Sequence, residues 1–528
     1  MGILNKIKAG NVASKAGDPV LTRISEADNV PWYRKPNLRS LYFLLVPAAI
    51  GIEITSGFDS QLINALQIVP AWNKYFHKPE GSLSGIIAAS YSLGAILSLP
   101  FIPWVDDKVG RRGSILVGSL IMIIGSIIQG LSINVGMYIA ARLILGFGIP
   151  ACIVAGSSLI GELGYPKERP YLTSLFNVSY FVGQVLAAGI VFGTNSIKGD
   201  WSWRIPSYLQ MAPSLLQVVF VLFLPESPRW LVGHDRIEEA EAILIKYHAE
   251  GNADSEFVKG EIEQIRTTLQ LEKEASRKSW LDLLSTPGMR RRTLVTSHLG
   301  LFSQWSGNTL ISYYFGTLLT LAGIKDTITK QKLNVGYACW SLVSGLIATA
   351  VIKKFKRRSL YMFCTVSLLV VYTGWTVAMQ KTNATAGKKG HTNRSAGIAS
   401  VFFIFIYQPC YNIGFNALTY TYMVEVWPYM ERSRGIAVFQ LFGRLAGFFT
   451  TFVNPIGLKN ITWKWLVVYC CWLTYEVIFV WFFFPETADR TLEELAFLFE
   501  DEATARHAAK AVEEAVHHET VTDEKRFA

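Results

Sequence analysis

Charged side chains and cysteine are scarce in this chain of 528 residues. Asp, Glu, Lys and Arg together make up 17% of the sequence, whereas 51% of it is hydrophobic and 13% is aromatic. The 6 cysteines lie within apolar stretches and lack the spacing of metal ligands, so we expect neither disulfides nor a metal site. A soluble chain of this length would form several domains with charged surfaces, which this composition disfavours.

Common motifs of catalytic and ATP-driven proteins are also missing. The sequence contains no phosphate loop of the Gly-Lys type, no cluster of metal ligands and no triad-like set, so we expect no cofactor and no enzymatic activity. The net charge of +10 does not indicate nucleic-acid binding, because the basic residues form short clusters between apolar runs. The lipid bilayer is the better partner.

Long apolar runs are abundant. A helix needs roughly 20 apolar residues to cross about 30 Å of hydrocarbon, since its backbone polar groups have to be satisfied within the segment. Twelve such runs predict an all-α membrane protein with two halves of six helices. The expected spans are residues 41–63, 84–104, 114–131, 137–160, 171–193 and 205–224, then 294–321, 333–352, 360–379, 396–426, 436–452 and 465–484.

The charged segments between and around these halves set the expected orientation. We expect an N-terminal tail at 1–40, a first half at 41–224, a linker with short helices at 225–293, a second half at 294–484 and a C-terminal tail at 485–528. With both tails and the linker in the cytoplasm, the inner segments hold 35 Lys and Arg residues against 13 outside. This asymmetry predicts cytoplasmic termini, in a multi-pass protein that we assign to the plasma membrane.

Internal repetition favours a carrier whose two halves rock about a central site, over a channel or a non-transporting receptor. Pro225-Glu226-Ser227 closes the sixth span and Pro485-Glu486-Thr487 closes the twelfth. Residues 162–169 after the fourth span likewise resemble residues 425–434 after the tenth.

Opposite charges recur at the expected cytoplasmic helix ends. A plain topogenic cluster is the simpler interpretation of a single Arg-Arg pair. Repetition instead favours ion pairs that hold the inner side closed and whose loss would favour the inward-open state. The expected gate residues are Asp107, Arg111, Arg112, Glu162, Arg169, Glu226, Arg229, Glu425, Arg432, Arg434, Glu486 and Arg490.

Four motifs resemble the sugar porters of the major facilitator superfamily over roughly residues 41–500: Asp107 to Arg112, Arg142-x3-Gly146-x-Gly148, Pro225 to Leu231 and Pro485 to Glu493. Finer features resemble the fungal lactose permease branch, which also includes carriers of other sugars: Gly57-Phe58-Asp59, Gln304 to Asn308, Asn454-Pro455-Ile456 and Trp463-Lys464-Trp465. The resemblance implies a proton-coupled sugar importer for lactose or a related disaccharide. We expect the protein to work as a monomer. Lys353 to Arg358 departs from the family's loop motif, so we expect an asymmetric inner lock.

Asp59 and Arg142 are the expected coupling residues, because an ionisable side chain inside a span is expensive and marks a functional site by default. Arg142 can stabilise the ionised Asp59, whereas separating the pair favours protonation. In the family, proton-driven porters tend to carry an acid at the position of Asp59. A static structural ion pair is the alternative.

Sugars bind to amides, hydroxyls and flat aromatic rings. Read by position against the family, Gln304 matches a sugar-binding glutamine, Thr309 replaces an asparagine, Asn177 replaces a glutamine and Asn412 replaces an acid. Polar residues in spans also serve as contacts between helices. The expected substrate-binding residues are Asn177, Gln304, Trp305, Asn308, Thr309, Tyr313, Asn412 and Arg444.

Arg444 leaves two interpretations open. It could bind a carboxylate, making a sugar acid or another organic acid the substrate, or it could form a structural pair with Glu476, which we favour. A monosaccharide carrier, a carrier of another metabolite and a non-transporting sugar sensor are further alternatives.

Overall fold

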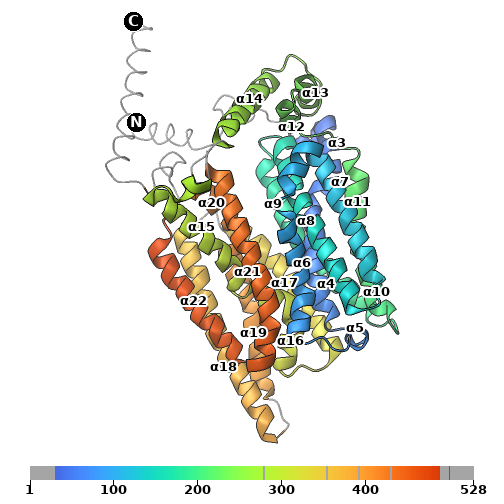
Figure 1. Ribbon diagram of the computed structural model, residues 1–528, viewed down its shortest axis with the longest axis vertical. Helices are drawn as coiled ribbons and strands as arrows, with labels where there is room; N and C mark the ends of the chain where they lie inside the picture. The colour runs from blue at the N-terminus through green and yellow to red at the C-terminus, as the bar shows by residue number, and fades with distance from the viewer. Residues whose placement is uncertain are drawn as a thin grey trace.

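The computed structural model describes residues 30–276, 280–351, 355–389, 393–427, 431–487 and 499. Every regular element in these ranges is a helix, and the helices run side by side in an elongated bundle (Figure 1).

Six membrane-crossing segments form the first half. The first segment consists of α3 (Pro36–Leu45), the π-helical turn η2 (Val46–Ile50) and α4 (Ile52–Leu66), and the short α5 (Pro70–Tyr75) follows it. The others are α6 (Ser82–Ser98), α7 (Ile102–Gly130), α8 (Val135–Leu163), α9 (Arg169–Thr194) and the pair α10 (Trp201–Leu209) and α11 (Met211–Val221).

Six further segments form the second half. They are α15 (Pro287–Trp305) with α16 (Asn308–Leu321), α17 (Thr327–Val351), α18 (Arg357–Lys389), α19 (Arg394–Tyr411) with η5 (Asn412–Asn416) and α20 (Thr419–Val426), α21 (Arg432–Ile461) and α22 (Lys464–Phe483). The prediction of an all-α bundle with twelve spans in two halves is confirmed.

Short helices between the halves define the two ends of the bundle. α12 (Pro228–Gly233), α13 (Ile237–His248), α14 (Glu256–Ser276) and the 3-10 turn η3 (Trp280–Leu284) lie at one end, which we call the linker side (Figure 1). The opposite end, which carries α5, is called the loop side. We place the N-terminus of α3 at the linker side, where Glu250 accepts hydrogen bonds from the backbone N–H groups of Asn37 and Leu38 at 3.1 and 3.0 Å.

Helix boundaries follow from local chemistry. A side-chain oxygen accepts a hydrogen bond from a free backbone N–H in the first turn of four helices, which stabilises each start by about 1 kcal/mol. These caps are Asn134 on α8, Ser227 on α12, Thr286 on α15 and Asn393 on α19.

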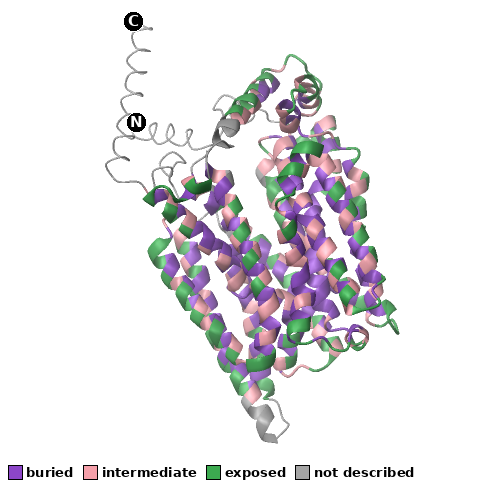
Figure 2. Ribbon diagram, in the orientation of Figure 1, coloured by how far each residue is buried: buried purple, intermediate pink, exposed green. Residues whose placement is uncertain are grey.

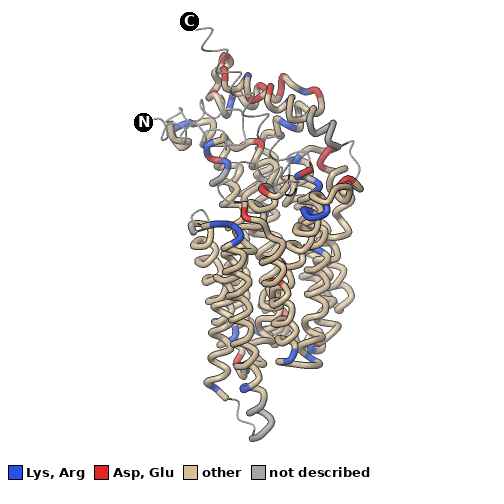
Figure 3. The backbone as a smooth tube through the Cα atoms, turned by 90° about the vertical axis from the view of Figure 1, so that its left-hand side faces the viewer, with Lys and Arg blue, Asp and Glu red and all other residues tan. Residues whose placement is uncertain are grey.

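The outer surface is suited to lipid. Large apolar side chains face outward, with Phe43, Phe223 and Phe482 being 71%, 68% and 74% exposed. Exposed residues lie on the outside of the bundle, and charged residues gather at its two ends (Figures 2 and 3). In the described residues, 9 stretches are long and apolar enough to cross a membrane. The second span is shorter, and the sixth and seventh are each divided into two helices.

The expected boundary of the second span is wrong, because α6 ends at Ser98 and the chain turns before α7 begins at Ile102. Gly110 then interrupts α7 with φ 79° and ψ 177°. A Cβ at this position would lie 2.4 Å from Oε2 of Glu226, so the close approach of this carboxylate requires glycine.

Contacts toward the loop side join the two halves. α4 packs against α16, α6 against α21 and α9 against α17. Asn334 on α17 accepts hydrogen bonds from Gln61 at 2.7 Å and Asn64 at 3.1 Å on α4, and Lys459 pairs with Glu80 at 3.3 Å. The halves are therefore fastened to each other at this end.

Candidate functional site

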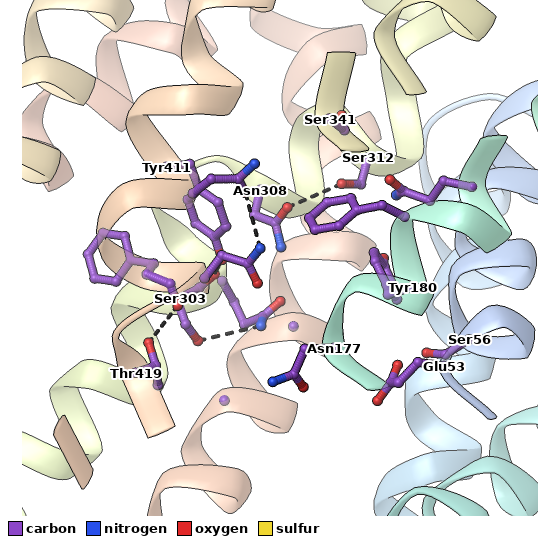
Figure 4. A pocket seen from close by; sticks show the side chains of 18 of the residues that line it. Glu53, Ser56, Asn177, Tyr180, Ser303, Asn308, Ser312, Ser341, Tyr411 and Thr419 are labelled. Atoms are coloured by element: carbon purple, nitrogen blue, oxygen red, sulfur yellow. Dashed lines mark hydrogen bonds between the residues drawn. The ribbon is translucent and has the colours of Figure 1, made fainter. Parts of the chain in front are cut away.

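A central cavity of about 390 Å³ lies between the two halves. Side chains reach it from both halves, as Figure 4 shows for a part of its wall. Amides, hydroxyls and aromatic rings dominate the lining, which includes Tyr91, Asn177, Tyr180, Gln184, Gln304, Asn308, Ser312, Tyr313, Tyr337, Ser341, Gln408, Tyr411, Asn412, Asn416 and Gln440. Such a wall offers both hydrogen-bonding groups and flat apolar faces to a ligand.

Six of the eight expected substrate residues line this cavity: Asn177, Gln304, Asn308, Tyr313, Asn412 and Arg444. The other two, Trp305 and Thr309, do not, so their placement at the cavity is corrected. Trp305 lies against Trp472 of α22 with ring centroids 4.2 Å apart, and Thr309 donates a hydrogen bond to Thr450 at 2.9 Å.

Helical spacing explains this division. Asn308 and Ser312 are four residues apart within α16, so they share a face, and Gln304 lies on α15 before the break. Trp305 and Thr309 are each displaced by one residue, which turns them about 100° away from that face.

A chain of hydrogen bonds holds the amides on the second half. The Tyr337 hydroxyl donates to Gln408 at 2.5 Å, Gln408 donates to Asn412 at 3.3 Å, and Asn412 donates to Ser344 at 2.8 Å. The sequence analysis missed Gln408 and Tyr337. Their signal was a tyrosine and a glutamine within apolar runs, which is too common to select them.

Asp59 and Arg142 form a bidentate pair, as the sequence predicts that they can. Both nitrogen–oxygen distances are 3.2 Å, and the side chains are 1% and 0% exposed. The guanidinium also donates from Nε to the carbonyl of Ile87 at 2.8 Å. Two parallel hydrogen bonds fix the geometry of the pair and partly offset the desolvation of both charges.

Two residues that the sequence analysis missed complete this pair. Gln210, at the junction of α10 and α11, donates to Asp59 at 2.7 Å. Tyr91 lines the cavity, and its ring centroid lies 5.6 Å from the guanidinium carbon of Arg142. The ring of Tyr91 thus connects the buried ion pair to the wall of the cavity.

The favoured pairing of Arg444 with Glu476 is wrong. Glu476 contacts Ser306 at 2.9 and 3.1 Å and is fully buried, whereas Arg444 lines the cavity together with Glu53. Glu53 on α4 and Arg444 on α21 thus reach the cavity from opposite halves. α22 packs Glu476 against the break of the seventh span, so the two charges belong to different sites.

At the linker side of the first half, two glutamates hold the arginine motif. Arg111 pairs with Glu162 at 3.4 Å. Glu226 accepts the backbone N–H groups of Arg111 and Arg112 at 3.0 and 3.3 Å. Burial raises the pKa of the Glu226 carboxyl, although these N–H groups oppose the shift.

The second half repeats this arrangement with residues that the sequence analysis missed. Arg357 pairs with Glu425 at 3.3 Å, and Glu486 accepts the backbone N–H groups of Arg357 and Arg358 at 2.9 and 3.2 Å. The two halves therefore share this arrangement of arginines and glutamates. The run that ends with Arg357 and Arg358 still lacks the acid and the glycine of the family's loop motif, so the expected asymmetry in those two residue types remains.

Asp107 does not take part in the buried network. Its carboxylate is 84% exposed and lies 4.0 Å from His234, while Asp106 is the buried neighbour whose carbonyl accepts from Arg111 at 3.4 Å. The backbone of Asp107 contributes instead, by accepting from the indole of Trp230 at 2.8 Å. The helical turn before Gly110 points the side chain of Asp107 outward.

The remaining gate residues divide between the linker and the second half. Arg169 pairs with Glu261 of α14 at 2.9 Å, and Arg434 lies 3.9 Å from Glu431. Arg229 and Arg432 also make interactions on this side. Arg490 lies outside the described residues.

Taken together, two six-helix halves, a polar cavity between them and a buried ion pair beside it define a secondary transporter of the major facilitator fold. Residues 44–499 match the family described as sugar (and other) transporters. The chain therefore belongs to this family of sugar porters.

Known relatives agree with this assignment. A high-affinity glucose transporter of Kluyveromyces lactis is 28% identical over 509 residues, which are 91% of this chain and 89% of the relative. The MFS-type transporter oryC of Aspergillus oryzae is 28% identical over 414 residues, 78% and 76% of the two chains. A partially occluded inward open structure of the xylose transporter XylE from E. coli matches with a TM-score of 0.70 and 20% sequence identity. The match covers 86% of this chain and 100% of the XylE chain.

Proposed function

We propose that this protein is a proton-coupled sugar importer that works by alternating access. The observation that carries the proposal is the bidentate Asp59–Arg142 pair next to a cavity lined by amides and aromatic rings. A buried carboxylate whose partner lies on another helix can change its protonation when the helices move. The XylE structure described as a proton:xylose symporter supports the same coupling.

In this proposal the paired Asp59 is the carboxylate that has released its proton. Movement of α8 relative to α4 would separate the guanidinium from the carboxylate, and an unpaired carboxyl in an apolar environment is more stable in its neutral form. Tyr91 contacts Arg142 and also lines the cavity. We therefore propose that a sugar bound against this ring alters the Asp59–Arg142 pair. The membrane potential then contributes about 2.3 kcal/mol per proton per 100 mV.

We assign the linker side to the cytoplasm of a plasma-membrane protein, on the distribution of Lys and Arg. The described conformation then faces inward, because Asn334 and its partners fasten the halves at the outer end. The arginine–glutamate networks connect helices within one half each, so we propose that they brace each half as a rigid body during the movement.

The substrate that we propose first is a neutral monosaccharide, since several relatives are named as glucose transporters. Motifs such as Gly57-Phe58-Asp59 resemble the lactose permease branch and support a disaccharide instead. The amide chain through Gln408 and Asn412 offers hydrogen-bonding groups to either ligand.

A specific observation favours a second candidate, a sugar acid or another organic acid. Arg444 lines the cavity, where its guanidinium can reach a ligand carboxylate, and Glu53 lies on the opposite half. A neutral sugar has no need of this charge pair.

Uptake of radiolabelled glucose, galactose, lactose, cellobiose and galacturonate in transporter-deficient cells tests the proposal. We expect accumulation of at least one neutral sugar together with alkalinisation of the medium. Absence of uptake for every sugar, with the protein present at the cell surface, contradicts the importer and favours a sensor. If galacturonate is the only compound taken up, the acid carrier is supported. Its uptake should then be lost in Arg444→Ala and retained in the matched surface variant Arg236→Ala.

A further inference from the structure

Glu476 is a second buried carboxyl, and the proposed proton pathway does not use it. It lies on α22 and is fully buried. Its oxygens lie 2.9 and 3.1 Å from Oγ of Ser306, one of the two residues between α15 and α16. Within the described residues it makes no ion pair.

The hydrogens around Ser306 can be counted. Its hydroxyl carries one hydrogen and also lies 2.5 Å from the carbonyl oxygen of Phe302. Two oxygens at this distance repel each other unless a hydrogen lies between them, and a carbonyl can only accept. The hydroxyl hydrogen therefore points to Phe302, and the contact with Glu476 needs a hydrogen from the carboxyl.

The groups that surround Glu476 also favour its neutral, protonated form. Titratable groups near Glu476 include Tyr372 and Cys364 on α18, Tyr411 on α19 and Tyr469 on α22. All of them are neutral or negative, so none can balance an ionised carboxylate. A buried carboxylate without a cation is far less stable than a protonated carboxyl that donates one hydrogen bond.

We propose that Glu476 is a resident proton-binding site in the second half, a protonated carboxylic acid that donates to Ser306 and positions the break of the seventh span. Ser306 and Gly307 separate the helices that carry Gln304 and Asn308, two residues of the cavity wall. An anchor at this break sets the angle between α15 and α16. Unlike Asp59, this carboxyl keeps its proton throughout the transport cycle.

Infrared difference spectra between the wild type and Glu476→Gln test the protonation directly, and they do not depend on transport. We expect a carbonyl band of a protonated carboxylic acid that the variant lacks and that persists in mildly alkaline buffer. Asp59→Asn is the matched control, because it removes another buried carboxyl and should leave this band unchanged. Absence of the band in the wild type overturns the proposal.

Transport kinetics test the positioning role and rest on the proposed sugar uptake. Glu476→Gln keeps a donor to Ser306, so KM and accumulation should match the wild type. Glu476→Ala removes the anchor and should raise KM by about threefold to tenfold at an unchanged surface level. If Glu476→Ala fails to fold, Ser306→Ala should raise KM in the same way.

Two results would overturn the inference. Loss of accumulation in Glu476→Gln with retained exchange would show that the carboxyl gains and loses its proton during transport. An unchanged KM in both Glu476→Ala and Ser306→Ala would show that the contact does not position the site.

Discussion

Asp59 illustrates how a single carboxylate is held in the interior of the bundle. Three hydrogen bonds reach it, two from Arg142 and one from Gln210, and these donors come from α8 and from the junction of α10 and α11. Each donor belongs to a different helix from the acceptor on α4. Any movement among these helices therefore changes the stability of the charged form.

Asp59→Asn should abolish accumulation of the sugar while leaving exchange across the membrane measurable. The amide cannot bind and release a proton, but it retains an oxygen that accepts from Arg142. Preloaded vesicles measure exchange, and cells with a proton gradient measure accumulation. Asp326→Asn, a variant of an exposed loop carboxylate, is the control and should transport normally. Accumulation at the wild-type level in Asp59→Asn would contradict the coupling role.

At the scale of single elements, the break in the seventh span depends on one glycine. Gly307 has φ +101°, in the left-handed region that residues with a Cβ rarely adopt. A Cβ there would also lie 1.7 Å from the hydroxyl of Tyr372. Both the backbone conformation and the close packing require glycine.

Gly307→Ala should lower the melting temperature and raise KM, because the backbone strain alone costs about 1–3 kcal/mol and the contact with Tyr372 adds to it. Thermal unfolding of the purified protein measures the first effect and uptake measures the second. Gly336→Ala on α17 is the matched control, since no atom lies within 4 Å of the added Cβ. Equal melting temperatures for the two variants would refute this account.

The linker helix α14 is attached to the first half through a charge cluster. Glu261 contacts His248 at 2.7 Å and Arg169 at 2.9 Å. Burial alone would raise the pKa of Glu261, but His248 and Arg169 outweigh it and lower the pKa below its usual value of 4.5. The cluster therefore stabilises the docked linker while the carboxylate is ionised.

The pH dependence of this docking follows from the sign of the shift. A carboxyl whose folded pKa is lowered contributes stability above its unfolded pKa and loses it as the pH falls through the folded value. Protection of α14 against hydrogen exchange, corrected for the intrinsic exchange rate at each pH, should accordingly decrease as the pH is lowered below about 4.5. Glu261→Gln should show faster exchange at neutral pH and a weaker dependence on acid. If Glu261→Gln shows the same pH dependence of exchange as the wild type, groups other than Glu261 cause that dependence.

At the scale of the whole molecule, polar contacts at the loop side join halves that are otherwise braced separately. Asn334 accepts from both Gln61 and Asn64, and Asn64 in turn accepts from the backbone N–H of Phe315 at 3.1 Å. The Arg111–Glu162 and Arg357–Glu425 pairs act within their own halves. If the halves rock as proposed, the loop-side contacts are the ones that open.

Asn334→Ala should shift the population toward the state that is open at the loop side. Two hydrogen bonds of about 1 kcal/mol each are lost, which changes the ratio of states by roughly thirtyfold. Distances between spin labels on the two halves measure this shift. Asn73→Ala is the control, because Asn73 donates only within its own half, to Gln67 and Val69. An unchanged distance distribution in Asn334→Ala would show that these contacts do not hold the loop side closed.

Local patterns were sufficient for the number of spans, the two halves and the Asp59–Arg142 pair. An apolar run follows from what the bilayer requires of each segment alone, and an ionisable side chain inside a span needs a partner that satisfies its charge. Finer assignments failed where the local pattern was ambiguous. The sequence analysis named Asp107 as a gate residue although Asp106 is the buried acid, and it did not include Arg357 among the gate residues.

The sequence by itself determined the membrane fold, its two-fold repetition and six of the residues that line the cavity, because hydrophobic length and helical spacing are properties of short segments. Only the tertiary structure decided that Arg444 faces Glu53 and the cavity, while Glu476 contacts Ser306. Those contacts depend on the orientation of α21 and α22 about their own axes and on the helices against which they pack. No short segment contains that information.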